Sequence, residues 1–547
     1  MQITRRDFLK DITLAAAVVG LPGWAINLDE APPATLRASA PAPYPWQWTP
    51  PQNLGQGSPT VTALNRIAFG PRPGDFERVQ AIGVDTYIEE QLAPATIDDS
   101  ALEQQLAKKY PTLKMSAVEL YQNYPQPAPV SPQERAFRAF RAGEQGIKPQ
   151  QLPGPQDVIQ ELQEATILRA IFSRRQLQET LADHWSNHFA MFIGKDAVKW
   201  MKTVDDREVI RKHALGKFGD MLLASAQSPA MLAYLDNHLN VKGVPNENYA
   251  REIMELHSLG VDGGYTQKDV QELARVLTGW TVKQPRRALL GGMDYTDAGQ
   301  FIFNANQHDT GAKIVLGVNF SGKDGINEGL KMVDVLAHHP STAKFVTKRL
   351  IMRYIADTPP PDLWNRAAQT FTQTKGDLRA TLSVILHSDD FKNSFAQKIK
   401  RPFELVASMA RATDMQVEEM RPFNATIRAM GQGLFLLLTP DGYPDTGTAW
   451  INTGALLARW NLALITAYGR VPQAKVDFKA AMSGANIKTV ANAVDFWIER
   501  ILHRAIPDKD RQKLIAALGA NANANFDIAR LPDLVALILA SPHFQYR

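Results

Sequence analysis

Apolar residues recur every three or four positions along most of this chain, which is the spacing of one face of an α-helix. The clearest run is QLQETLADHWSNHFAMFI, residues 176–193, where the apolar positions are Leu177, Leu181, Trp185, Phe189 and Phe192. Comparable runs occupy residues 270–280, 342–356, 378–388, 455–468 and 533–541, each bounded by Gly, Pro, Ser or Thr. Alternating strand patterns are few. The pattern predicts a mainly α, multi-helix globular domain with a minor peripheral β-hairpin.

Segments rich in proline or glycine divide the chain. Residues 26–58 are rich in Pro and Ala, which is typical of an extended tether, and residues 59–547 are expected to form the helical domain. Residues 121–156 are expected to form a surface insertion, because Pro and Gln flank a charged helical piece there. The stretch 283–309 contains GQFIFNA, whose alternation predicts a small hairpin.

Residues 1–25 have the layout of an export signal. Arg5 and Arg6 supply the charges, residues 12–21 are apolar, and Gly23 and Ala25 are small. The segment TRRDFLK resembles a twin-arginine signal, so the twin-arginine translocation machinery is the expected partner. We therefore expect a periplasmic or extracellular protein.

The apolar part of this signal is too short to cross a bilayer, which needs about 20 residues. The position of cleavage stays open, because the small-residue segment Ala38–Ala40 is followed by Pro41, a residue that usually blocks cutting. An uncleaved membrane tether is therefore an alternative. No other transmembrane span is expected.

The amino-acid composition excludes several kinds of catalytic and metal-binding site. The chain of 547 residues contains no cysteine, which excludes disulfides, thiolate catalysis, iron–sulfur clusters and thiolate zinc sites. Any metal must be held by His, Asp, Glu, Asn or carbonyl oxygen. The 60 Lys and Arg residues against 56 Asp and Glu give a net charge of only +4, so a nucleic-acid partner is not expected.

Two histidines share one face of the helix predicted around residue 185. His184 and His188 lie about 40° apart on the helical wheel, within the apolar arc, and are expected to face inward. Histidines at this spacing can bind one metal ion. The alternative is a pair of buried histidines with backbone or carboxylate partners.

A helix–loop–helix is predicted over residues 245–280. Asn246 opens the first helix and Gly260 closes it, whereas Thr266 caps the second helix with Asp269 three positions later and Gly279 ends it. The connecting loop VDGGYT invites comparison with a calcium-binding loop. The upstream acidic ligands of such a loop are absent, which favours a glycine-rich turn instead.

The first of these helices carries more polar chemistry than capping requires. Glu252 and His257 lie near the edges of its apolar stripe, while Asn248 and Arg251 belong to the same short segment. We predict a tentative metal-binding set of His184, His188, Glu252 and His257. Neutral imidazoles with one carboxylate would suit zinc, copper or iron, with an open position for water or substrate.

A loop at NQHDTGAKIVLG, residues 306–317, contributes His308 and Asp309 as further candidates, together with Asn248 and Arg251. The alternative for Asp309 is a cap on the turn formed with Thr310 and Gly311. Motifs of metalloproteases, di-iron bundles, esterases and phosphate-binding loops are absent from the sequence.

Several longer blocks resemble an uncharacterised bacterial family, domain of unknown function 1800. The blocks include LNRIAFGPRPGD, DHWSNHF, SPAMLAYLDN, HDTGAKIVLG, HPSTAKFVTKRL, PDGYPDTGTAWINTGALLARWN and the long central NENYAREIMELHSLGVDGGYTQKDVQELARVLTGW. Together they span roughly residues 59–545. The chain departs from the usual pattern at Tyr443, where the family commonly has Trp, and at the unusually apolar GLFLLLTPD. The resemblance implies an exported, mostly helical protein, commonly encoded beside a sulfatase-like protein, but no reaction.

Two functions remain open from the sequence. One is a metal-dependent enzyme with a His/Glu site between helices, and the other is a non-catalytic binding or assembly partner of the sulfatase-like exported protein. Metal content and co-purification distinguish them.

Replacing Arg5 and Arg6 together with lysines should retain the protein in the cytoplasm, because twin-arginine recognition requires the pair and not merely positive charge. Cell fractionation followed by immunoblotting measures this. Normal export of the double variant would refute the assignment of the signal.

Overall fold

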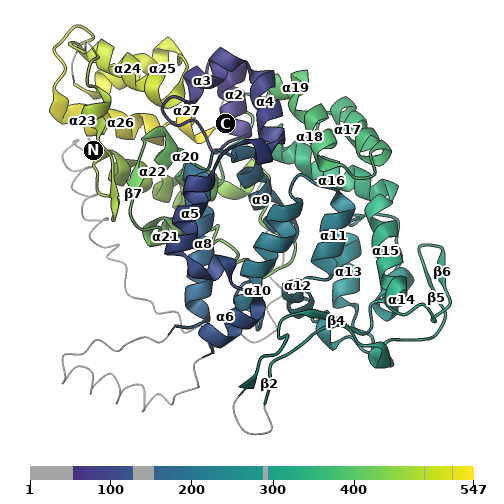
Figure 1. Ribbon diagram of the computed structural model, residues 1–547. Coiled ribbons are helices and arrows are strands. Elements are labelled where there is room, and N and C mark those ends of the chain that lie inside the picture. The colour runs from purple at the N-terminus through teal and green to yellow at the C-terminus, as the bar shows by residue number, and fades with distance from the viewer. Residues whose placement is uncertain (1–52, 127–152, 288–292, 486, 520) are drawn as a thin grey trace, which may run out of the picture. The chain divides into compact units, whose positions relative to one another are not determined.

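The computed structural model describes residues 53–126, 153–287, 293–485, 487–519 and 521–547 (Figure 1). The signal with Arg5 and Arg6, nearly all of the tether and residues 127–152 of the expected insertion lie outside the described residues. Residues Thr49–Arg547 belong to one compact unit. Helices dominate this unit, so the prediction of a mainly α fold is confirmed.

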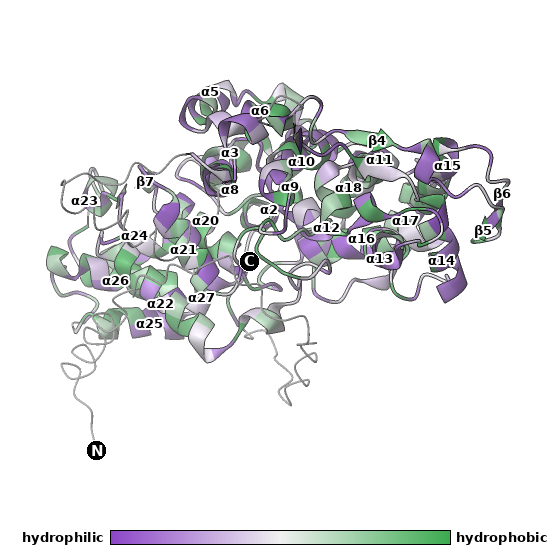
Figure 2. Cartoon of the chain, turned by 90° about the horizontal axis from the view of Figure 1, so that it is seen from below, coloured by the Kyte–Doolittle hydropathy of each residue, from purple (hydrophilic) through white to green (hydrophobic). Residues whose placement is uncertain are grey.

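The N-terminal half of the described chain is built mainly of helices. They are α2 (Pro59–Arg66), α3 (Asp75–Ile82), α4 (Val84–Leu92), α5 (Ser100–Lys109), α6 (Ala117–Asn123), α8 (Pro155–Phe172), α9 (Gln176–His188), α10 (Val198–Asp205), α11 (Phe218–Ala226), α12 (Pro229–Tyr234), α13 (Glu247–Glu255) and α14 (Gln267–Val276). A π-helical segment, Asp206–Arg211, continues α10. In both views α9 lies between the helices from α11 to α18 and those from α20 to α26 (Figures 1 and 2).

The second half is also built of helices. They are α15 (Ile326–His338), α16 (Pro340–Tyr354), α17 (Pro361–Gln373), α18 (Leu378–Leu386), α19 (Asp389–Lys392), α20 (Pro402–Ala412), α21 (Arg421–Ala429), α22 (Thr453–Ala467), α23 (Phe478–Ala481), α24 (Val490–Leu502), α25 (Asp508–Ala517), α26 (Leu531–Ala540) and α27 (Pro542–Gln545). Many of these helices carry both hydrophobic and hydrophilic residues (Figure 2).

The strands in the described part form four antiparallel pairs. They are β1 (Trp280–Val282) with β4 (Phe301–Phe303), β2 (Arg286–Arg287) with β3 (Met293–Asp294), β5 (Lys313–Val315) with β6 (Val318–Phe320), and β7 (Gln416–Val417) with β8 (Ala474–Lys475). The β5–β6 pair lies at the edge of the molecule in both views (Figures 1 and 2). The hairpin expected within 283–309 exists but begins earlier, because Trp280 already pairs with Phe303.

Local signals set the ends of the two helices that carry the central motif. The Asn246 side chain accepts a hydrogen bond from the Asn248 amide, and Thr266 forms a complete capping box with Asp269, as predicted. Gly260 has a φ of 84° and Gly279 a φ of 80°, values that favour glycine, so both chain reversals need this residue. The helix–loop–helix is therefore determined locally.

Two apolar cores hold the helices together. The first core draws on residues between positions 63 and 391, and includes Leu177, Leu181 and Trp185 of α9. The second joins parts of the N-terminal half, chiefly α8, to residues 403–544. Helices α9 and α16 contribute to the first core, whereas α20 contributes to the second.

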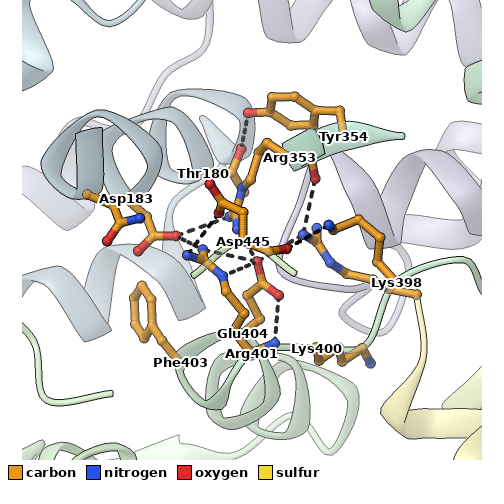
Figure 3. Close-up of polar contacts among 12 residues, drawn as sticks. Thr180, Asp183, Arg353, Tyr354, Lys398, Lys400, Arg401, Phe403, Glu404 and Asp445 are labelled. Atoms are coloured by element: carbon orange, nitrogen blue, oxygen red, sulfur yellow. Dashed lines mark hydrogen bonds and ion pairs between the residues drawn. The ribbon is translucent and has the colours of Figure 1, made fainter. Parts of the chain in front are cut away.

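A buried group of charged side chains connects these helices across the two cores (Figure 3). Asp183 of α9 pairs with Arg401 and lies 3.2 Å from a guanidinium nitrogen of Arg353 on α16. The Glu404 carboxylate of α20 forms ion pairs with three arginines. They are Arg353, Arg401 at 3.2 Å and Arg547 at 2.9 Å. We call these five residues the central ion network. The central ion network fixes the positions of α9, α16 and α20 relative to one another.

No helix of the described residues is long and apolar enough to cross a membrane.

Removing the charge of Glu404 should destabilise the fold strongly, because three buried guanidiniums would lose their shared carboxylate. We expect Glu404→Gln to lower the free energy of unfolding at neutral pH by about 3–5 kcal/mol, the usual cost of breaking a buried pair. The matched control is Glu418→Gln, an exposed carboxylate paired with Lys475, which should change it by at most about 1 kcal/mol. Urea unfolding followed by circular dichroism measures both.

The Glu404 effect should also depend on pH. Burial acts to raise the pKa of Glu404, but the arginines more than offset it and hold the pKa well below the ordinary 4.5. The stabilisation is therefore fully present above about pH 4.5 and is lost as the pH falls through the lower pKa of the folded state. A difference between wild type and variant that stays constant into acid would contradict this assignment.

Candidate functional site

Helix α9 places two histidines against the first core. His184 and His188 lie on the same side as Leu181 and Trp185, and both imidazole rings contact the Trp185 ring, with centroids 4.8 and 5.4 Å away. Both histidines are buried, so the predicted inward orientation is confirmed. The opposite side of α9 carries Asp183, which belongs to the central ion network.

His257 joins these two residues from the end of α13. The Nε2 atom of His188 lies 3.0 Å from the carbonyl oxygen of His257, and the two rings are 6.3 Å apart between centroids. His257 is fully buried and also packs against the Phe189 ring. We call His184, His188 and His257 the histidine cluster. It joins α9 to α13, as a site shared by these helices requires.

The histidine cluster is electrically neutral at physiological pH. Burial lowers the pKa of His184 and of His257 to about 3, and lowers the pKa of His188 well below its ordinary value. The positive charge of Arg349 acts in the same direction on all three. Four ring nitrogens have no hydrogen-bond partner among the described residues: Nε2 of His184, Nδ1 of His188, and both nitrogens of His257. Such unpaired buried groups are unusual in a purely structural cluster.

Arg349 of α16 brings positive charge to the cluster. Its guanidinium lies 3.8 Å from the carboxylate of Asp445 and 5.9 Å from the Phe345 ring centroid. Asp445 is shared, since it also lies 3.6 Å from Arg401 of the central ion network. Burial acts to raise the pKa of Asp445, but Arg401 and Arg349 more than compensate, so that it is lowered and Asp445 stays ionised.

Asp445 belongs to residues 438–447, which we call the aspartate loop. Asn187 of α9 holds this loop with a two-way amide contact: its side chain donates to the Tyr443 carbonyl at 2.8 Å and accepts from the Tyr443 amide at 2.7 Å. Gly442 has a φ of 79°, and a Cβ there would lie 2.3 Å from the Asn187 carbonyl oxygen. Glycine at position 442 therefore allows the loop to pack closely against the end of α9.

Two charged side chains, Asp357 and Lys398, hold the C-terminal end of the aspartate loop. Asp357 accepts a hydrogen bond from the Gly447 amide at 2.7 Å, and Lys398 donates to the Asp445 carbonyl at 2.9 Å. Tyr234 of α12 donates to the carbonyl of Leu438 at 2.9 Å. Contacts with Asp357, Lys398 and Tyr234 thus hold the loop at both of its ends.

Glu252 is the unusual carboxylate of the site. It lies on α13, half-buried, and its carboxylate forms no hydrogen bond or ion pair with any residue that the structure describes. Burial raises its pKa to about 7, and the negative charges of Glu255 and Asp441 add to this effect against the opposing charge of Arg251. Asp441 of the aspartate loop also acts on Arg349, but the Glu252 carboxylate makes no hydrogen bond or ion pair with His184, His188 or His257.

The other candidates on α13 have structural partners. Asn248 donates to the carbonyl of Leu235 at 3.2 Å, and Arg251 contacts Glu247 at 3.0 Å and Gln267 at 2.9 Å. These contacts secure the start of the helix–loop–helix.

His308 and Asp309 belong to a different cluster. The Nδ1 atom of His308 lies 2.9 Å from the carbonyl of Thr278, and its Nε2 atom lies 3.4 Å from Glu328. Asp309 pairs with Arg275 at 2.9 Å and accepts from the Gly311 amide at 2.8 Å, which confirms the turn-capping alternative. None of their contacts within the described part reaches the histidine cluster.

Arg349 and the central ion network were not recognised in the sequence. Arg349 and Arg353 lie one helical turn apart, close to the buried positions Val346 and Leu350 of α16. A helical wheel of residues 342–356 would therefore have placed two arginines beside the apolar stripe. These two arginines beside an apolar stripe are the sequence pattern from which the buried charges could have been predicted.

A cavity of about 320 Å³ lies elsewhere, beside the π-helical segment. Five of its charged residues pair with one another: Arg211 contacts Glu179 at 2.9 Å and Asp206 at 2.7 Å, and Arg169 contacts Glu103 at 2.8 Å. Because these five side chains already have ionic partners, we place the candidate chemistry at the histidine cluster.

Two smaller hollows, of about 20 and 40 Å³, lie along the Asp183 side of α9. Both are lined by Asp183 and Ser186, and the second also by Asn187 and Tyr443. The second of these hollows, which Tyr443 lines, leaves room for water next to the aspartate loop.

Glu252 should make the stability of the protein depend on pH. Its raised pKa means that its protonated form is favoured in the folded state, so this stabilisation is fully present below about pH 4.5 and is lost as the pH rises through about 7. We expect Glu252→Gln to melt at a higher temperature than wild type above pH 7, with a smaller difference below pH 4.5. Calorimetry across this range measures it.

Glu208→Gln is the matched control for that series, since Glu208 is exposed and paired with Arg207 at the surface. It should show no such step. A Glu252→Gln difference that is independent of pH would overturn the assignment.

Comparison with known proteins gives the family and no activity. A family model described as protein of unknown function DUF1800 matches residues 62–546, which include the histidine cluster, Glu252, Arg349 and the aspartate loop. No curated protein and no solved structure matches the chain. The chain therefore belongs to the DUF1800 family of proteins of unknown function.

Proposed function

We propose that the protein is an exported enzyme that works at the histidine cluster, with Glu252 as the group that donates or accepts a proton. The observation that carries this proposal is the Glu252 carboxyl: it is half-buried, has no polar partner among the described residues, and its pKa is raised to about 7. A group with this pKa exists in both protonation states near neutral pH, as general acid–base catalysis requires.

The neighbouring side chains supply complementary chemistry. Neutral imidazoles can donate or accept a hydrogen bond, and four of their nitrogens in the cluster are free to do so. Arg349 provides positive charge that would stabilise negative charge developing on a substrate. Burial limits the contact of the imidazoles with water, which strengthens electrostatic effects around them.

A metal-dependent form of this enzyme remains a prediction of the sequence. His184, His188, Glu252 and His257 would hold zinc, copper or iron in that form. Within the described part of the chain, no three His, Asp or Glu side chains are grouped as a metal site requires. The charge of Arg349, which already lowers the pKa of each histidine, would also oppose an added cation. We therefore infer that the imidazoles act by hydrogen bonding.

We place this activity outside the cytoplasm. The support is the twin-arginine segment with Arg5 and Arg6, which implies translocation in a folded state and either release or retention by an uncleaved tether.

A second candidate function is binding to the sulfatase-like exported protein. An exposed apolar stripe on α22 supports it: Leu457, Trp460 and Tyr468 follow one side of the helix and its end, with 54%, 48% and 43% of their surfaces exposed. Exposed aromatic and aliphatic side chains of this kind are typical of protein interfaces.

One preparation tests both candidates. Protein exported natively and purified without an affinity tag should contain less than one equivalent of metal, and a chelator should leave its melting temperature unchanged. Full metal occupancy would instead support the metal-dependent form. Co-elution of the sulfatase-like protein, lost on Trp460→Ser, would support the second candidate.

The enzymatic proposal is tested with an extract of the producing cells. Wild-type protein should deplete at least one compound detected by mass spectrometry, and Glu252→Gln should slow this depletion about 100-fold or more. Glu208→Gln should act like wild type. If wild type changes no compound, the enzymatic proposal fails.

A further inference from the structure

Arg349 has an unusual environment for a guanidinium. Only 15% of its side-chain surface is exposed, yet its guanidinium forms no hydrogen bond with any described residue, and the carboxylate oxygen of its ion pair with Asp445 is 3.8 Å away. A guanidinium carries five N–H donors, and leaving them unpaired away from water is costly. The site therefore lacks acceptor atoms at this position.

Two other buried arginines are paired closely. Arg547 lies 2.9 Å from Glu404, and Arg411 donates to the carbonyls of Gly70 and Ile171 at 2.6 Å and to Asp75 at 2.9 Å. Both side chains are 3% exposed, whereas that of Arg349 is 15% exposed. Arg349 therefore combines partial burial with a guanidinium that has no close acceptor among the described residues.

The surroundings of Arg349 offer donors in place of acceptors. Its guanidinium lies 5.9 Å from the Phe345 ring centroid, and the centroid of the His188 ring lies 6.1 Å from that of Phe345. The proton of neutral His188 is on Nε2, which donates to the His257 carbonyl, but the unpaired Nε2 of His184 and one nitrogen of His257 can each be the protonated nitrogen of a neutral imidazole. The nearest carboxylate, Asp445, is already shared with Arg401. An additional anion would meet the Arg349 guanidinium and one N–H donor from each of His184 and His257.

We propose that Arg349 and the histidine cluster bind a phosphate- or sulfate-type oxyanion, carried by the substrate of the enzyme proposed above, on which this inference rests for its biological role. A tetrahedral oxyanion offers acceptor oxygens in several directions, which suits donors that come from α9, α13 and α16. The planar fork of Arg349 binds two of the oxygens, and the N–H groups of His184 and His257 bind the others. Charge also favours this ligand over a cation, since Arg349 attracts the first and repels the second.

The experiment uses the full chain with inorganic phosphate or sulfate as the probe and chloride at equal ionic strength as the reference. Calorimetric titration should show binding of at least one of the two oxyanions to wild type, with a rise in melting temperature that chloride does not produce. Arg349→Gln should weaken this binding about tenfold or more, because it removes a charge-assisted pair of hydrogen bonds.

Matched variants separate the site from general charge effects. Lys344→Gln removes one positive charge from the exposed side of the same helix and should bind the oxyanion like wild type. Arg349→Lys keeps the charge but loses the planar fork, and should bind with intermediate affinity. Equal affinity of wild type and Arg349→Gln, or no binding by wild type beyond that of chloride, overturns the proposal.

A measurement on wild type guards against a variant that fails to fold. The ring-nitrogen resonances of His184, His188 and His257 should shift together on addition of the oxyanion, whereas those of His338, exposed on α15, should not. Unchanged cluster resonances overturn the proposal. Glu252→Gln should retain oxyanion binding, so a failed catalytic test with intact binding would refute the proposed enzyme while supporting this site.

Discussion

The desolvation of Asp183 and Glu404 is the constraint on which the centre of the molecule depends. A buried carboxylate costs several kcal/mol unless opposite charges and hydrogen bonds surround it. Here Arg353, Arg401 and Arg547 supply those charges from α16, from the residue before α20 and from the end of the chain. The two carboxylates are compensated only when all these segments meet, so the network joins the two apolar cores in a single arrangement.

That arrangement also determines where the candidate site lies. Because Asp183 anchors one side of α9, the other side presents His184 and His188 to the first core and to α13. Arg401 then extends the network to Asp445, and Asn187 clamps the same loop one turn further along α9. The histidine cluster and the aspartate loop are thus positioned by one helix with two functionally different faces.

The charge distribution of the site favours ligands that bring acceptor oxygens. Burial keeps the imidazoles neutral, and Arg349 lacks a close partner among the described residues, while Glu252 retains a pKa of about 7 at the periphery. Neutral donors, one cation and one titratable carboxyl form a consistent set for binding an anion and transferring a proton near neutral pH. The exposed stripe on α22 is separate in character, since it is apolar.

The sequence by itself determined what is local: the mainly α fold, the helix around residue 185 with its inward histidines, the cap at Thr266 and the chain reversals at Gly260 and Gly279. Helical periodicity and capping act over a few residues, so they can be recognised without a partner. Only the tertiary structure decided that Arg349 and His188 lie near the same Phe345 ring and that His308 instead lies beside Glu328. Those contacts join residues far apart in the chain. The free-energy cost of burying a charge depends on which partners surround it, and these partners come together only in the folded chain.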